Sequence, residues 1–167
     1  LVKARRAAAL GLRVMIDFHF SDSWADPGQQ TVPAAWAGYD LPQMKTAVAA
    51  HVTSVLTKLR SFGITPEWVQ VGNETRTGML WPLGSIDKGG NYAELSNAGY
   101  DAVKAVFPGA KVIVHIDCGD NLAFYTRVFD YMRQYGGKYD VIGMSLYPEK
   151  GKGAVYADKC VDNIKTL

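Results

Sequence analysis

Four short runs of apolar residues stand out along the chain, and longer stretches with helical periodicity separate them. The runs cover residues 13–20, 68–71, 111–117 and 141–146. Their side chains are apolar almost continuously rather than at every second position, which is typical of parallel strands buried on both faces. The pattern therefore predicts a parallel sheet of about four strands.

The stretches between the runs predict helices. Asp40 has a side chain suited to an N-cap, Pro42 suits the first turn, and Gly63 lies just past the end of the helix. Its apolar positions recur at helical spacing, at Met44, Val48, Val52, Val55, Leu56 and Leu59. Similar patterns predict helices over residues 1–10, 91–107, 121–135 and 154–167. In the second of these, Asn91 and Glu94 have the spacing of a capping box.

This alternation predicts an α/β fold with right-handed crossovers and helices on the outer face of the sheet. A Gly-rich phosphate-binding turn follows none of the predicted strands, which argues against a nucleotide-binding doubly wound sheet. The chain opens within a predicted helix and has no initiator Met, so we expect it to be a piece of a longer protein.

Composition excludes several kinds of partner. The 167 residues carry 18 basic and 16 acidic side chains, a net charge of +2, with no basic stripe that would suit nucleic acid or an anionic membrane. The apolar runs are too short to span a bilayer. Cys118 and Cys160 lack the spacing of a metal site, and the sequence leaves open whether they pair. We expect no metal and no cofactor.

Residues with reactive or hydrogen-bonding side chains lie near the carboxyl end of each predicted strand or just after it, namely Asp17, His19, Asn73, Glu74, His115, Asp117 and Tyr147. Because the carboxyl ends of parallel strands meet at one rim, a (β/α) barrel would place these side chains together at an active site. The long loops on that side contain Trp24 and Trp81. Aromatic rings beside carboxylates, amides and imidazoles suit a sugar, whose apolar face stacks while its hydroxyls form hydrogen bonds.

Four segments carry a resemblance to glycoside hydrolase family 53, the endo-β-1,4-galactanases, which are retaining (β/α)8-barrel enzymes. They are HFSDSWADPGQQTVPAAW at 19–36, VQVGNE at 69–74, GMLWPLG at 78–84 and DVIGMSLYP at 140–148. The similarity extends over essentially the whole chain, and the first segment is the most specific. The chain departs from the pattern at Cys118, where the resemblance predicts Asn.

The resemblance implies that Glu74 is the general acid/base and that Asn73 binds the sugar hydroxyl next to the reacting carbon. The family's nucleophile, a Glu on the seventh strand, has no match here. We therefore expect residues 1–167 to be a single partial barrel domain, truncated at both ends, that contains barrel strands three to six. Such a fragment alone would be inactive, and its open edges would favour self-association. A calcium site known in some relatives would lie outside this region.

Alternative roles exist for most of these residues. Asp17, His19 and His115 could bond to each other instead of to a ligand, Asn73 could bond within its turn, and Tyr147 could cover the rim. Trp24 and Trp81 could pack loops, while Asp22 and Asp26 could bond backbone amides. Glu149 follows a strand, but we do not expect it to replace the missing nucleophile.

The substrate implied by the resemblance is β-1,4-galactan or a galacto-oligosaccharide from pectic arabinogalactan. Such an enzyme would be secreted, periplasmic or attached to the cell surface, because the polymer does not cross membranes. Three alternatives remain: a carbohydrate-binding half barrel without turnover, another retaining β-glycanase of the same clan, and a purely structural half barrel.

Overall fold

The computed structural model describes all residues from 1 to 167 and contains one sheet of four parallel strands in the order β1-β2-β3-β4. The strands are β1 (Met15–Phe18), β2 (Trp68–Val71), β3 (Lys111–Ile116) and β4 (Val141–Met144). The register pairs Asp17 with Gln70, Gln70 with Ile113, and His115 with Gly143. The predicted sheet is confirmed, although β1 and β4 are shorter than the apolar runs that contain them.

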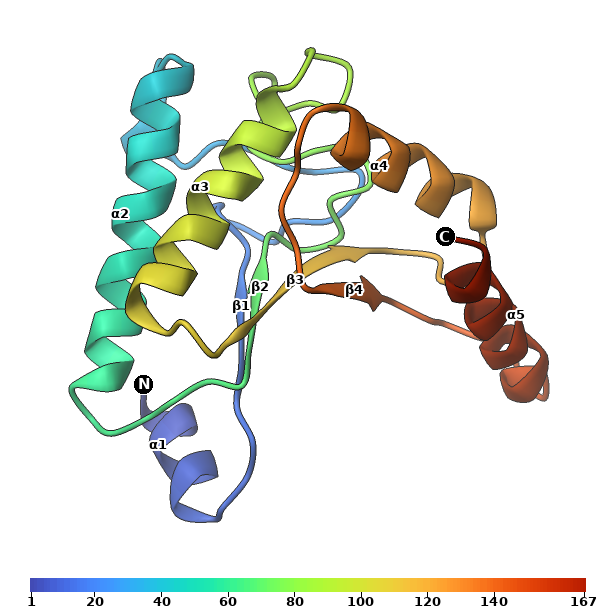
Figure 1. Ribbon diagram of the computed structural model, residues 1–167, viewed down its shortest axis with the longest axis horizontal. Coiled ribbons are helices and arrows are strands. Elements are labelled where there is room, and N and C mark those ends of the chain that lie inside the picture. The colour runs from blue at the N-terminus through green and yellow to red at the C-terminus, as the bar shows by residue number, and fades with distance from the viewer.

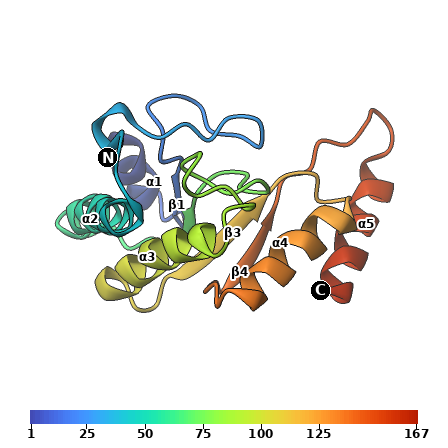
Figure 2. The ribbon, with the colours of Figure 1, turned by 90° about the horizontal axis from the view of Figure 1, so that it is seen from above.

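The helices are α1 (Val2–Ala9), α2 (Leu41–Arg60), α3 (Asn91–Val106), α4 (Leu122–Gln134) and α5 (Gly153–Thr166), with a short 3-10 helix η1 (Ala34–Trp36). Figure 2 shows α2, α3, α4 and α5 following one another in an arc outside the strands. Figure 1 shows long loops at one end of the sheet and short connections at the other. Four adjacent parallel strands with helices along their outer side have the arrangement expected for a sector of a (β/α)8 barrel.

The core lies between the sheet and these helices. The predicted stripe on α2 is buried apart from the half-buried Val55, and α4 buries Tyr125, Phe129 and Met132. Gly99 lets α3 approach β2, because a Cβ at this position would lie 2.5 Å from a methyl carbon of Val71.

The N-terminus of α2 confirms the predicted N-cap, and the N-terminus of α3 contradicts the predicted capping box. Asp40 caps α2 by accepting from the backbone N–H of Gln43, whose side chain accepts from the backbone N–H of Asp40. The capping box predicted at Asn91 is wrong. Asn91 is already the first helical residue and donates to the carbonyl of Leu83, while Glu94 forms an ion pair with Lys45.

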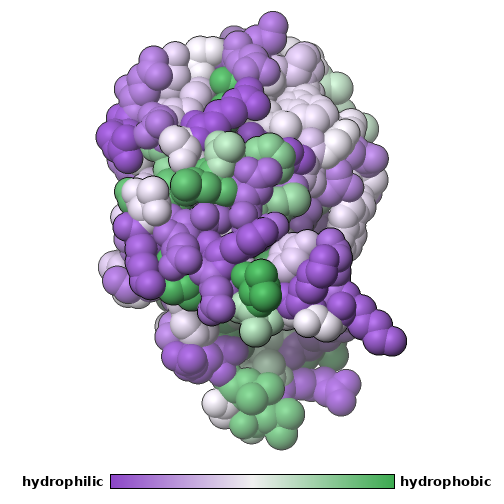
Figure 3. Space-filling view, turned by 90° about the vertical axis from the view of Figure 1, so that its right-hand side faces the viewer, coloured by the Kyte–Doolittle hydropathy of each residue, from purple (hydrophilic) through white to green (hydrophobic).

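The two outer strands are more exposed than the inner two. β1 pairs only with β2, and β4 only with β3. Met15 on β1 is 51% exposed, and every residue of β4 is half-buried, whereas β2 buries three of its four residues. On the face that carries α5, hydrophobic residues reach the surface in separate patches (Figure 3).

None of the helices has both the length and the apolarity needed to cross a membrane.

Candidate active site

The backbone at the end of β2 places Glu74 at the rim. Glu74 has a φ of 48°, an uncommon conformation for a residue with a side chain, and such backbone outliers often occur at functional sites. The next residue fixes the turn, because the backbone N–H of Thr75 donates to the carbonyl of His115 at 2.8 Å and its hydroxyl lies 2.7 Å from that of Tyr92. The turn that carries Glu74 is therefore attached to both β3 and α3.

The Glu74 carboxylate points toward β4. The hydroxyl of Ser145 lies 2.6 Å from Oε1 of Glu74 and 2.8 Å from Nε2 of His115. The other ring nitrogen of His115, Nδ1, accepts from the backbone N–H of Glu74 at 3.3 Å and lies 3.2 Å from Oδ1 of Asn73. Sequence reasoning missed Ser145, although it directly follows β4, and position at the end of a strand could have identified it.

A second group of side chains joins the ends of β1 and β2. Asp17 lies 3.0 Å from Nε2 of His19 through one oxygen and accepts from the side-chain amide of Gln70 at 2.6 Å through the other. Gln70 also contacts Oδ1 of Asn73 at 3.3 Å, and the Asn73 amide donates to the carbonyl of Ala25 at 2.8 Å. Several predicted site residues therefore bond to each other, and Gln70 was missed because it lies within a buried strand.

Asp117 lies at the end of β3 and forms an ion pair with Arg76, whose Nε is 2.9 Å from Oδ1 of Asp117. The Arg76 guanidinium also lies 4.0 Å from the centre of the Phe124 ring. Cys118 donates its thiol to the second carboxylate oxygen of Asp117 at 3.3 Å. Sequence reasoning missed Arg76, which lies two positions after Glu74 in a loop without an obvious motif.

The aromatic residues of the predicted site differ in their surroundings. Trp24 is 70% exposed and its ring lies 5.1 Å from that of His19, so its indole is free to stack on a ligand. Trp81 is half-buried and donates its indole N–H to the carbonyl of Thr77. Tyr147 is 86% exposed, and its hydroxyl forms no hydrogen bond. The structure thus leaves Tyr147 at the end of β4 but outside the network around Glu74.

The carboxylates of Asp22, Asp26 and Glu149 bond to neighbouring groups outside the network around Glu74. Asp22 and Asp26 accept from the backbone N–H groups of Ala34 and Gly28, as the alternative interpretation predicted. Glu149 is exposed, and hydrogen bonds from Lys152 and Tyr156 lower the pKa of its carboxyl. Cys118 and Cys160 are both free thiols.

Burial at the centre of the site favours the neutral form of His115. Burial lowers the pKa of His115 below its usual value, and the nearby carboxylates of Glu74, Asp17 and Asp117 only partly oppose this effect. A neutral imidazole has one donor and one acceptor nitrogen, so the hydrogen-bond partners of the ring decide which nitrogen carries the proton.

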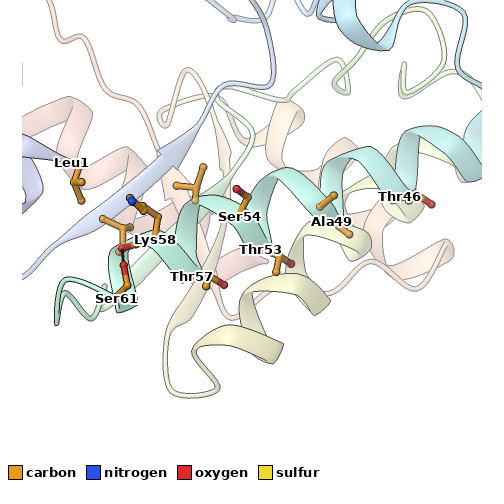
Figure 4. A pocket seen from close by; sticks show the side chains of 11 residues that line it. Leu1, Thr46, Ala49, Thr53, Ser54, Thr57, Lys58 and Ser61 are labelled. Carbon is orange, nitrogen blue, oxygen red and sulfur yellow. Dashed lines mark hydrogen bonds between the residues drawn. The ribbon is translucent and has the colours of Figure 1, made fainter.

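The largest surface hollow of the molecule lies elsewhere. An open groove of about 1100 Å³ follows the outer side of α2 between Leu1 and Thr46. Figure 4 shows small and hydroxyl side chains of α2 lining it, among them Ala49, Thr53 and Thr57. The groove contains no carboxylate or imidazole, so it is not a second candidate for catalysis.

A comparison with protein families identifies the chain: residues 1–166 match the model of glycosyl hydrolase family 53. The chain belongs to glycosyl hydrolase family 53. An arabinogalactan endo-beta-1,4-galactanase of Thermothelomyces thermophilus is 36% identical over 151 residues, which are 87% of this chain and 45% of that protein. A probable arabinogalactan endo-beta-1,4-galactanase A of Aspergillus terreus is also 36% identical, over 87% of this chain and 44% of its own length.

Solved structures agree with the family 53 assignment. The family 53 catalytic domain of Ignisphaera aggregans superimposes with a TM-score of 0.89 at 35% identity, and a fungal β-1,4-galactanase superimposes with 0.90 at 32%. Each match covers 99% of this chain but only 45% and 52% of the compared chain. A psychrophilic family 10 xylanase shares the fold alone, with a TM-score of 0.67 at 14% identity. The chain thus spans about half the length of its relatives.

Proposed function

We propose that this family 53 chain forms the acid/base side of the cleft of a retaining endo-β-1,4-galactanase, with Glu74 as the general acid/base. The observation that carries the proposal is the position of the Glu74 carboxylate. It lies at the carboxyl end of β2 and is hydrogen-bonded to Ser145 from the end of β4. In (β/α) barrels this end of the strands carries the active site. The galactanase names of the relatives supply the substrate class.

Retaining hydrolysis needs a second carboxyl group about 5–5.5 Å from the first, which attacks the anomeric carbon. Asp17 is occupied by His19 and Gln70, and Asp117 by Arg76, so neither is free to act as this nucleophile. Glu149 bonds to Lys152 and Tyr156 instead. A polypeptide of residues 1–167 therefore supplies the proton donor, and we expect it to bind galactan without cleaving it.

The other proposed site residues would bind the sugar. Asp17, His19, Asn73, His115, Asp117 and Tyr147 offer hydrogen bonds to hydroxyl groups, and Trp24 and Trp81 offer aromatic surface. The exposed indole of Trp24 beside His19 supports this role most directly. Because a galactan polymer cannot enter a cell, the proposal includes a secreted, periplasmic or surface location for the enzyme.

The experiment is a titration of the 167-residue chain with β-1,4-galactotetraose and, as a matched control, xylotetraose. We expect galactotetraose to bind at millimolar concentration or better and to shift the NMR signals of His19 and His115. An equal response to xylotetraose would favour another β-glycanase, and no response to either sugar would favour a purely structural half barrel. Release of reducing ends from galactan at the rate of an intact galactanase would contradict the proposed lack of turnover.

A further inference from the structure

The Nδ1 atom of His115 faces both a donor and an acceptor. The backbone N–H of Glu74 points at it from 3.3 Å, and Oδ1 of Asn73 lies 3.2 Å away. The Asn73 amide cannot easily turn round, because its nitrogen donates to the carbonyl of Ala25 and its oxygen faces the amide of Gln70. A ring nitrogen either donates or accepts, so Nδ1 satisfies only one of these two neighbours at a time.

The same choice exists at the other end of the ring. The Ser145 hydroxyl lies between Nε2 of His115 at 2.8 Å and Oε1 of Glu74 at 2.6 Å. It has a single proton, so it donates either to the carboxylate or to the ring. A closed circuit of hydrogen bonds therefore runs from the Glu74 backbone through His115 and Ser145 back to the Glu74 side chain. Its donors and acceptors can be arranged in two consistent ways, which differ in the direction of each hydrogen bond.

We propose that Ser145 and His115 are positioning residues for Glu74, and that the tautomer of His115 changes with the charge of the Glu74 carboxyl. The proposal rests on the acid/base role of Glu74 proposed above. With Glu74 ionised, its backbone N–H donates to Nδ1, the Nε2–H donates to Ser145, and the Ser145 hydroxyl donates to Oε1. With Glu74 protonated, Oε1–H donates to Ser145, Ser145 donates to Nε2, and Nδ1–H donates to Asn73.

The two states differ by one proton. A proton from a solvent hydronium ion that binds Nδ1 allows the Nε2 proton to pass to Oγ of Ser145 and the Oγ proton to pass to Oε1. One O–H bond of the hydronium ion, Nε2–H and Oγ–H break, while Nδ1–H, a new Oγ–H and Oε1–H form, and the hydronium ion becomes water. Ser145 and His115 end neutral, and Glu74 gains the proton. In retaining hydrolysis the same carboxyl group acts first as an acid and then as a base. The circuit would stabilise its protonated form in the first step and its ionised form in the second.

Burial favours a neutral His115 ring in both states, and the surrounding carboxylates only partly oppose it. Burial lowers the pKa of His115, and His19 lowers it further, while Glu74, Asp17 and Asp117 raise it. Two of these three carboxylates are partly compensated, because Arg76 pairs with Asp117 and Gln70 donates to Asp17. Glu74 is the only one of the three whose carboxylate shares the Ser145 hydroxyl with the ring.

The test follows the histidine tautomer by long-range ¹H–¹⁵N NMR of the 167-residue chain and Glu74 protonation by the ¹³C shift of its carboxyl carbon. The chain has 3 histidines, so His19→Gln and His51→Gln variants assign the His115 signal. We expect the Nε2–H tautomer above the Glu74 midpoint and the Nδ1–H tautomer below it, with a shared midpoint. An unchanged tautomer, or a doubly protonated ring while Glu74 is ionised, overturns the proposal.

Two substitutions test the circuit itself. Ser145→Ala removes the hydroxyl that links the Glu74 carboxyl to the ring, so the His115 tautomer should no longer follow the charge of Glu74. Ser145→Thr keeps the hydroxyl and should restore this coupling. In Glu74→Gln the side-chain amide can donate as the protonated acid does, so His115 should remain in the Nδ1–H form at every pH. The Nε2–H form in this variant overturns the proposal even if Ser145→Ala does not fold.

These measurements need no sugar, so they are separate from the test of function. Loss of galactotetraose binding with intact tautomer coupling would refute the galactan proposal alone. Binding without coupling would refute only the circuit.

Discussion

The hydroxyl of Ser145 lies 2.6 Å from Oε1 of Glu74, although the two residues are 71 positions apart in the chain. Glu74 follows β2 and Ser145 follows β4, and β3 lies between these two strands. The side chains of Glu74 and Ser145 can therefore meet only if β3 sets the register of both neighbouring strands. The residue of β3 that connects them is His115, which contacts the backbone N–H of Glu74 and the hydroxyl of Ser145. The geometry of the proposed acid therefore depends on the register of three strands.

Gly143 is a sensitive point in this register. A Cβ at this position would lie 2.7 Å from a methyl carbon of Ile113 and 3.2 Å from Cβ of His115. Gly143→Ala should displace His115, weaken its contact with Ser145 and lower the free energy of unfolding by about 1–3 kcal/mol. Chemical denaturation and the NMR signal of His115 measure the two effects.

Gly153→Ala is the matched control, because a Cβ there would meet nothing within 4 Å. Equal stability and equal His115 signals in the two alanine variants would show that the close approach at Gly143 is unimportant.

The sequence predicted the framework of this site better than its connections. Continuous apolar runs identified the four strands, and the rule that strand ends share a rim brought Asp17, Asn73, Glu74, His115 and Asp117 together. It could not show which groups bond to each other. Ser145, Gln70 and Arg76 are ordinary polar residues in the sequence, and their roles depend on cross-strand distances that only the folded sheet defines.

The ion pair between Arg76 and Asp117 should contribute more to the free energy of unfolding than the exposed ion pairs do. It is largely shielded from solvent, and the guanidinium also stacks on Phe124. Arg76→Lys loses the planar guanidinium over the Phe124 ring and the short ion-pair contact of Nε with Asp117, which should lower the free energy of unfolding by about 1–3 kcal/mol. Arg127→Lys changes an exposed pair with Asp87 and should have almost no effect. Similar losses in the two variants in urea denaturation would contradict this ranking.

The exposed indole of Trp24 allows sugar binding to be separated from stability. Because its ring is 70% exposed, Trp24→Ala should leave the free energy of unfolding nearly unchanged. If the indole stacks on galactose, the Kd for galactotetraose should rise about threefold to tenfold. Trp24→Phe should retain part of the affinity. An unchanged Kd in calorimetry would remove Trp24 from the proposed substrate site.

The lowered pKa of His115 has a defined consequence for stability. The unfolded chain binds a proton at this residue near pH 6.5, whereas the folded chain resists it. The contribution of His115 to folding is therefore complete above about pH 6.5 and is lost as the pH falls below that value. His115→Gln should flatten the decline of the free energy of unfolding between pH 7 and pH 5, and the exposed His51→Gln is its control. A steeper decline in His115→Gln would reverse the assigned sign.

The open edges of the sheet should make the 167-residue polypeptide self-associate. The outer sides of β1 and β4 have no strand partner, and Met15 on β1 is half exposed. Unpaired parallel edges beside apolar surface are templates for further strands. Light scattering should therefore show a molar mass above that of the monomer that increases with concentration. Met15→Lys should shift the distribution toward monomer, because a charge on an edge strand opposes strand addition, whereas Leu10→Lys on the exposed end after α1 should not. A monodisperse monomer of the unmodified chain would refute the prediction and would require the edges to be protected in another way.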